Sequence, residues 1–148
     1  MWGADSTVKP ADAIQGQLGN CWLISAAMSI AEHPDRIKEI FEIDQKNSVG
    51  IYALTMHLLG MPVTVTIDDH LPIQTLWNGE KSTIYAKIGS EGAIWGTLFE
   101  KGFAKYLGNY EAIDAGHTAH GIEAMIGAPY TEWDHTEAIS TGIVEDLW

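Results

Sequence analysis

One apolar run restricts the folds open to this chain more than any other feature. The run extends from Cys21 to Ala31, contains no charged residue and is rich in Leu, Ile, Ala and Met. A helix that is apolar on nearly every side is expected to be buried nearly all round. The run is also far shorter than the ~20 residues that a membrane-spanning helix needs. The sequence therefore predicts a chain without a membrane span, folded around one central helix.

The segments that flank this run predict the elements around it. Helical periodicity indicates an amphipathic helix from Pro34 to Phe41, an aromatic-striped helix from Ile94 to Leu107 and a short helix from Ala119 to Ile126. Residues 51–59 and 63–67 are rich in β-branched and aromatic residues and predict a β-hairpin. We expect an α+β fold, mostly helical, in which residues 1–148 form a single domain.

The charge balance and the cysteine count limit the partners and the compartment. Eight basic and twenty acidic side chains give a net charge of −12, which repels phosphate backbones. Nucleic acid is therefore not an expected partner. The single cysteine cannot form an internal disulfide, and the first residues lack a secretory signal. A cytoplasmic location is the expectation.

The position of Cys21 indicates chemistry as well as packing. It begins the predicted central helix, where unpaired amides and the macrodipole favour a thiolate. Asn20 is predicted to cap this helix through its side-chain oxygen, and Gly16 and Gly19 allow a tight preceding loop. Gln15 supplies an amide donor that, with the Cys21 backbone N–H, could stabilise an oxyanion. A cysteine of this type is a candidate nucleophile.

The segment from Gln15 to Trp22 resembles the active-site segment of papain-like cysteine proteases, and specifically of the calpain family. Papain has a second cysteine three residues before the nucleophile, whereas calpains have leucine there, as this chain does at Leu18. The similarity continues through residues 65–72, 95–105 and 108–116, and covers roughly residues 8 to 133. The resemblance implies the nucleophile-bearing half of a papain-like protease core.

The resemblance also implies roles for individual residues. Cys21 matches the nucleophile and Gln15 the oxyanion-hole amide, while Trp22, Ala115 and Gly116 match positions along the substrate groove. From the residues alone, Trp22 could equally be a packing residue and Gly116 an ordinary loop glycine. The implied substrate is a protein or peptide.

A thiol protease also needs a general base and a group that orients it. Papain-type enzymes place this His and Asn about 130–150 residues after the cysteine, which lies beyond Trp148. We therefore expect the partner of this domain to be a second core subdomain that carries His and Asn, and we expect this part to be inactive alone.

Calpain cores are activated by calcium, and the resemblance places part of a calcium site in this half. Asp12 matches a carboxylate ligand, an oxygen donor that Ca²⁺ prefers. Ala93 stands where the family has a glutamate, and only Glu91, two residues away, could compensate. Calcium is thus a possible cofactor whose binding is weakened. Asn20 replaces an aspartate that pairs with the second half, so the coupling between the halves is expected to differ.

Two other functional classes remain open. The missing base, Ala93 and Asn20 also fit a catalytically dead calpain-like module that serves in binding or regulation. A transglutaminase-like thiol acyltransferase also places cysteine at a helix start, but Gln15 and the segment 68–72 argue against it.

His117, His120 and Glu123 match no zinc motif and are expected to form a solvated helix face.

Overall fold

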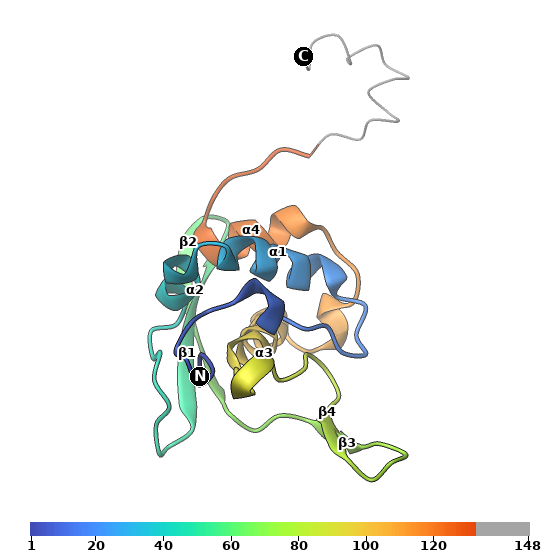
Figure 1. Cartoon of the computed structure of the whole chain (residues 1–148). Helices are drawn as coiled ribbons and strands as arrows, with labels where there is room; N and C mark the ends of the chain where they lie inside the picture. Colours follow the sequence, from blue (N-terminus) through green and yellow to red (C-terminus); the bar gives the residue numbers. More distant parts are fainter. Residues whose placement is uncertain (133–148) are drawn as a thin grey trace.

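The computed structural model describes residues 1–132, which form four α-helices, two β-hairpins and three short 3₁₀ turns (Figure 1). In chain order the elements are η1 Pro10–Asp12, α1 Cys21–Ala31, α2 Pro34–Ile40, β1 Ile51–Leu58, β2 Met61–Asp68, β3 Ile73–Thr75, β4 Lys81–Thr83, η2 Ser90–Gly92, α3 Trp95–Leu107, η3 Glu111–Ile113 and α4 Thr118–Ile126. Helix and hairpin content confirm the predicted α+β class. None of the described helices is long and apolar enough to cross a bilayer.

Helix α1 lies at the centre of the packing, as the apolar run predicts. It contacts α2, α3, α4 and η1, and Leu23, Ala26 and Ala27 are completely buried. The helix is not covered all round, however. One narrow stripe is exposed, and it consists of Cys21, Ser25, Met28 and Ser29. Their spacing places them on one side of the helix, so Cys21 lies at the end of the only strip of α1 that reaches solvent.

The hairpin of β1 and β2 packs against α3 and α4 and completes the core. Its antiparallel register runs from Ile51 opposite Asp68 to Leu58 opposite Met61. Leu59 and Gly60 form the turn with positive φ angles of 51° and 77°, which suits the twist of a two-residue hairpin loop. Tyr52, Leu54 and Met56 point into the core, together with Val65 and Ile67 from the partner strand. The predicted hairpin is therefore confirmed.

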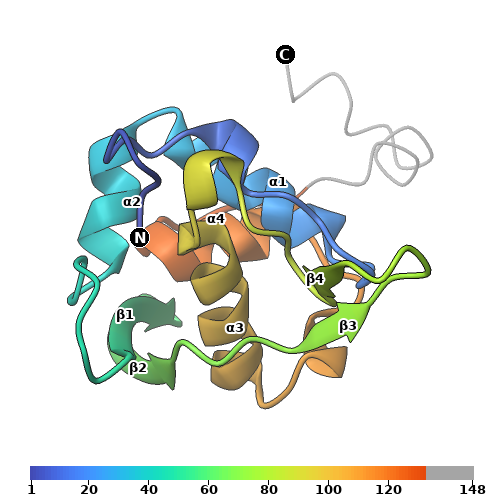
Figure 2. The same ribbon diagram turned by 60° about the horizontal axis from the view of Figure 1, so that its bottom comes forward.

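A second hairpin, β3 and β4, is absent from the sequence-based prediction. The two strands pair antiparallel, with Ile73 opposite Thr83 and Thr75 opposite Lys81. Each has three residues with little burial, so neither shows the apolar alternation by which a strand is recognised. Figure 2 shows this hairpin reaching away from the helices. Trp77 at its tip is 98% exposed.

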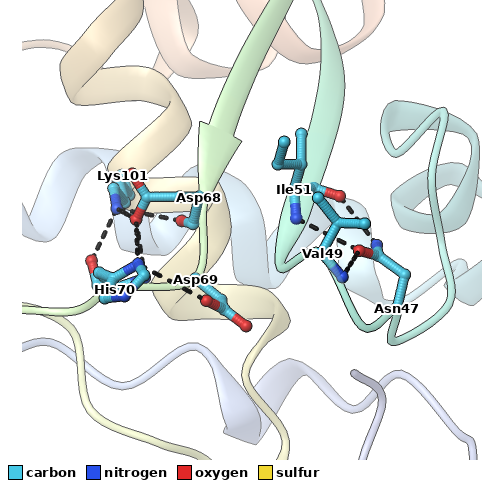
Figure 3. A network of polar contacts seen from close by, with 7 residues as sticks. All are labelled: Asn47, Val49, Ile51, Asp68, Asp69, His70 and Lys101. Atoms are coloured by element: carbon cyan, nitrogen blue, oxygen red, sulfur yellow. Dashed lines mark hydrogen bonds and ion pairs between the residues drawn. The ribbon is translucent and has the colours of Figure 1, made fainter.

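A polar network ties the end of β2 to α3 (Figure 3). The Lys101 ammonium donates to Asp68 Oδ1 at 2.7 Å and to the His70 carbonyl at 2.6 Å. Asp68 Oδ1 also accepts the His70 backbone N–H. The hydrogen bond from Lys101 is the main cause that lowers the pKa of Asp68 to about 2. The network fixes the point at which the chain leaves the first hairpin for the second.

Substitution of Leu23 tests how much of the stability α1 provides. Leu23 is fully buried, so Leu23→Ala should lower the free energy of unfolding by about 2–5 kcal/mol. Met28→Ala on the same helix is the matched control, because Met28 is 38% exposed and should cost well under half as much. Urea denaturation followed by circular dichroism measures both. Equal losses would show that α1 is not the centre of the core.

Candidate active site

Cys21 is the first residue of α1 and its side chain is exposed. Leu23 and Ile24 donate their backbone N–H groups to the Asn20 carbonyl and start the helix. The N–H groups of a first helical turn otherwise lack intrahelical acceptors and favour negative charge nearby. The predicted nucleophile thus has solvent access and lies at the positive end of a buried helix.

The loop before Cys21 is held by a segment of the chain about seventy residues later. Ile14 forms an antiparallel bridge with Lys87, and the Gln17 N–H donates to the Ile84 carbonyl. A Cβ atom on Gly16 would overlap the Tyr85 carbonyl, so only glycine permits this approach. Gln15 is exposed, and its Nε2 donates to the Leu18 carbonyl at 2.7 Å. The loop is therefore a tight, paired structure with the Gln15 amide on its surface.

Asn20 does not cap α1 in the predicted way. Its side chain makes no hydrogen bond to the helix amides. Instead it is fully buried, and Nδ2 donates to Glu100 Oε1 at 2.6 Å. This inward orientation corrects the expected cap. The expectation that Asn20 changes the coupling to a second subdomain stays a prediction.

Glu100 is the residue of this site that the sequence analysis missed. It lies in α3 with only 1% of its surface exposed, and its Oε2 accepts the Ala86 N–H at 2.7 Å. One carboxylate thereby joins Asn20, next to Cys21, to the segment that pairs with the Gln15 loop. Burial raises the pKa of Glu100, and the hydrogen bonds from Ala86 and Asn20 oppose this increase. The sequence signal that could have identified Glu100 is an acidic residue at a buried position of an amphipathic helix.

The loop that carries Ala115 and Gly116 contacts residues just before and just after Cys21. The Ala115 N–H donates to the Gly19 carbonyl, and Asp114 Oδ1 accepts the Gly19 N–H at 2.8 Å. Ala115 has a positive φ of 62°. This pair of bonds brings the loop that carries residues 115 and 116 against the turn before the cysteine.

Trp22 links the same loop to the core. Its Nε1 donates to the Ile113 carbonyl at 3.0 Å, and a Cβ on Gly116 would lie 2.5 Å from the Trp22 ring. Gly116 thus lies flat against the indole face, which only glycine allows. Trp22 is 8% exposed and packs edge-on to Phe103. Its packing role is established by these contacts, and a small part of its ring remains accessible.

The residues considered for calcium make their observed contacts within the protein. Asp12 is buried, and its Oδ1 accepts both the N–H and the hydroxyl of Ser90, at 2.8 and 2.6 Å. Ala93 is buried and supplies no oxygen, while a Glu91 oxygen lies 3.8 Å from the Lys9 ammonium. Among residues 1–132, no three His, Cys, Asp or Glu side chains gather in a metal-binding arrangement. Asp12 anchors the 3₁₀ turn η2 in this structure.

Two of the three residues expected on a solvated helix face, His117 and His120, are exposed, and Glu123 is half-buried. The His117 Nδ1 lies 3.4 Å from Glu132 Oε1. His120 and Glu123 also line an open cavity between α4, α3 and the tip of the first hairpin. Trp22, Ala115 and Gly116 line the same cavity. The three residues matched to a substrate groove therefore meet at one concave surface next to Cys21.

The burial of Glu100 makes stability depend on pH. Because folding raises the pKa of this carboxyl, the folded state holds the proton more tightly, and stability falls as pH rises from about 4.3 through the raised pKa. Glu100→Gln removes this dependence, since it replaces the carboxyl with an amide that is neutral at every pH. The difference in free energy of unfolding, variant minus natural chain, should therefore be more positive at pH 8 than at pH 4. Urea denaturation at the two pH values measures the difference.

Glu100→Ala is the companion variant. It removes the acceptor of two buried donors and should destabilise by about 1–3 kcal/mol at both pH values. If the free energy of unfolding changes with pH in the same way in the natural chain and in Glu100→Gln, the assignment of Glu100 as a buried carboxylate is wrong.

The Asp12 contacts predict a structural effect without calcium. Asp12→Ala removes the acceptor of the Ser90 N–H and hydroxyl and should lower stability by about 1–3 kcal/mol in the presence of a calcium chelator. Addition of calcium chloride should leave the midpoint of thermal unfolding of the natural chain unchanged. Differential scanning calorimetry measures both, and a calcium-dependent increase that Asp12→Ala abolishes would show that Asp12 binds calcium.

Comparison with known proteins identifies the family of this chain. The family described as calpain family cysteine protease matches residues 4–147. Calpain clp-1 of Caenorhabditis elegans is 37% identical over 119 residues, which are 78% of this chain and 15% of that protein. Calpain-B of Drosophila melanogaster is 36% identical, covering 82% of this chain and 13% of that protein. The rat calpain-2 catalytic subunit is 35% identical, with 82% and 17% covered.

The chain therefore spans only about a sixth of the length of these relatives. The matched region contains the whole site just described, from Asp12 through Gly116. The predicted family is confirmed: this chain belongs to the calpain family of cysteine proteases.

Proposed function

We propose that this chain is the nucleophile-bearing subdomain of a calpain-like cysteine endopeptidase core. The observation that carries the proposal is the position of Cys21, exposed at the first residue of a buried helix and flanked by two paired loops. A cysteine that served only packing would require neither solvent access nor this helix position. Its substrates would be proteins or peptides.

Cys21 would act as the nucleophile in peptide-bond hydrolysis. Its thiolate sulfur attacks the carbonyl carbon, a C–S bond forms, and the carbonyl oxygen becomes an oxyanion. The C–N bond then breaks as the leaving amine takes a proton from a general acid, leaving a thioester. Water hydrolyses the thioester and regenerates the thiol.

The oxyanion would be held by Gln15 and the Cys21 backbone N–H. A primary amide has two N–H donors, and one of those on Gln15 Nε2 already bonds the Leu18 carbonyl. That bond orients the amide and leaves the second N–H for the substrate. Such preorganised donors stabilise developing charge without reorganisation during the reaction. Ala115 and Gly116 would contact the substrate backbone along the loop beside Cys21.

The general base would come from a second subdomain that carries His and Asn. Proton transfer by a positioned base typically contributes about 10²–10⁴-fold to the rate, so this part of the core should not turn over by itself. Calcium enters no step of the proposed mechanism, since Asp12, the carboxylate matched to a calcium ligand, accepts hydrogen bonds from Ser90. The rival function, a binding module without catalysis, is favoured by Ala93 and predicts an unactivated Cys21.

Alkylation of Cys21 separates these two functions. The folded natural chain should react with iodoacetamide near pH 7 about two- to fivefold faster than the same chain in urea, because the helix N-terminus stabilises the thiolate. Since the chain has one cysteine, total label incorporation measured by mass spectrometry reports this site alone.

A relocated cysteine supplies the matched control. The double variant Cys21→Ser, Ser29→Cys moves the thiol to another exposed position of α1, near its C-terminal end. Its folded form should react no faster than its unfolded form. Equal acceleration at both positions, or none at Cys21, would refute the proposed activation and favour the binding module.

A further inference from the structure

The cavity beside Cys21 has a composition that selects one kind of side chain. Its volume is about 290 Å³, and it opens to solvent between α3, α4 and the turn of the first hairpin. This volume is near the lower end of the range typical of small-ligand sites. Its apolar wall includes the aromatic rings of Trp22, Phe103 and Tyr106. We call this space the aromatic cavity.

The aromatic rings of this wall pack against one another at steep angles, and Tyr106 is the most exposed of the three. The Trp22 and Phe103 centroids are 5.7 Å apart at 78°, and those of Phe103 and Tyr106 are 5.6 Å apart at 57°. Tyr106 is fixed further, since its hydroxyl donates to the His57 carbonyl at 3.0 Å. Rigid aromatic faces attract cations and methylene groups alike.

The charged groups of the aromatic cavity have one sign. Glu123 lines it, and neither lysine nor arginine is among its described lining residues. His57 and His120 also line the cavity. Burial raises the pKa of Tyr106, and the negative charge of Glu123 raises it further. The described lining thus contains one carboxylate and no lysine or arginine, in a chain whose net charge is −12.

We propose that the aromatic cavity binds a lysine or arginine side chain of a peptide, with its methylene stem against Tyr106 and Leu58 and its cationic head at Glu123. A long basic side chain matches both halves of the surface, because it has an apolar stem and a charged tip. An acidic head would be repelled, and a purely aliphatic side chain would leave the Glu123 carboxylate without a partner.

This inference deepens the proposed function, on which it rests for its link with proteolysis. Trp22, Ala115 and Gly116 belong to both the cavity lining and the loop beside the cysteine. A peptide whose backbone follows that loop can place a side chain in the cavity. The cavity would thus select substrates that carry a basic residue near the cleaved bond.

Binding can be measured without catalysis on the Cys21→Ala variant of the chain. Nitrogen-15 NMR titrations at pH 8 with Nα-acetyl-lysine methylamide should shift the Trp22 indole and Gly116 amide signals. The norleucine analogue, which lacks only the ammonium group, should bind about three- to tenfold more weakly, as expected for a partly exposed ion pair with a cation–π contribution. The Nε-acetyl-lysine analogue should resemble norleucine.

Two charge variants locate the contact. Glu123→Gln should weaken lysine binding about threefold or more and leave norleucine binding unchanged. Glu111→Gln is the matched control, since Glu111 lies in η3, is exposed and does not line the cavity. It makes the same change of net charge and should have little effect.

Three outcomes would overturn the proposal: equal binding of lysine and norleucine, signal shifts confined to other surfaces, or equal losses in the two variants. The comparison of ligands on the unmodified cavity holds even if Glu123→Gln fails to fold. Because the test omits the thiol, its result is independent of Cys21 activation. Lysine binding with an unactivated Cys21 would refute the proposed protease function and leave the basic-residue site in place.

Discussion

The arrangement of the site depends on one buried carboxylate. Glu100 accepts hydrogen bonds from the Asn20 side chain and the Ala86 backbone, at 2.6 and 2.7 Å. A charge in an apolar interior is costly unless its hydrogen-bonding capacity is used. Here that capacity joins the start of α1, the middle of α3 and the strand-like segment 84–87. The position of Cys21 relative to the Gln15 loop follows from this three-way link.

Apolar packing stabilises helix α1, whereas hydrogen bonds fix its position. Helix α1 supplies burial through most of its surface and leaves one exposed stripe that ends at Cys21. Burial alone would allow the helix to rotate or slide slightly, because hydrophobic contacts have little directionality. The directional bonds of Asn20, Trp22 and Gly19 remove that freedom. A nucleophile requires such fixed placement, since small errors of geometry reduce rates strongly.

The sequence was sufficient for most elements and for the family, and the reasons are local. Helix α1 begins at Cys21 and α3 ends before Gly108 as predicted, because an apolar period and a terminal glycine are signals within one segment. The first hairpin likewise follows from its own alternation. The sequence did not predict the hairpin of β3 and β4, because strands of three residues are too short to show such a pattern.

The site was harder to predict where partners are distant in sequence. Asn20 is of a residue type that caps helices, yet its side chain turns inward and its Nδ2 donates to Glu100, eighty residues later. Charge-assisted hydrogen bonds are roughly twice as strong as neutral ones. Likewise Asp12, a plausible metal ligand by type, is engaged by Ser90. Residue type identified the candidates, and long-range pairing determined their orientation.

The isolation of the second hairpin has a consequence for how the molecule responds to proteases. Within the described chain its strands pair only with each other, and Trp77 stands at its tip almost fully in solvent. The loop that follows is secured separately, by the pairing of Lys87 with Ile14 and of Ile84 with Gln17. A single nick near Trp77 would leave these attachments untouched. The two resulting pieces would stay associated as a non-covalent complex with the Cys21 environment preserved.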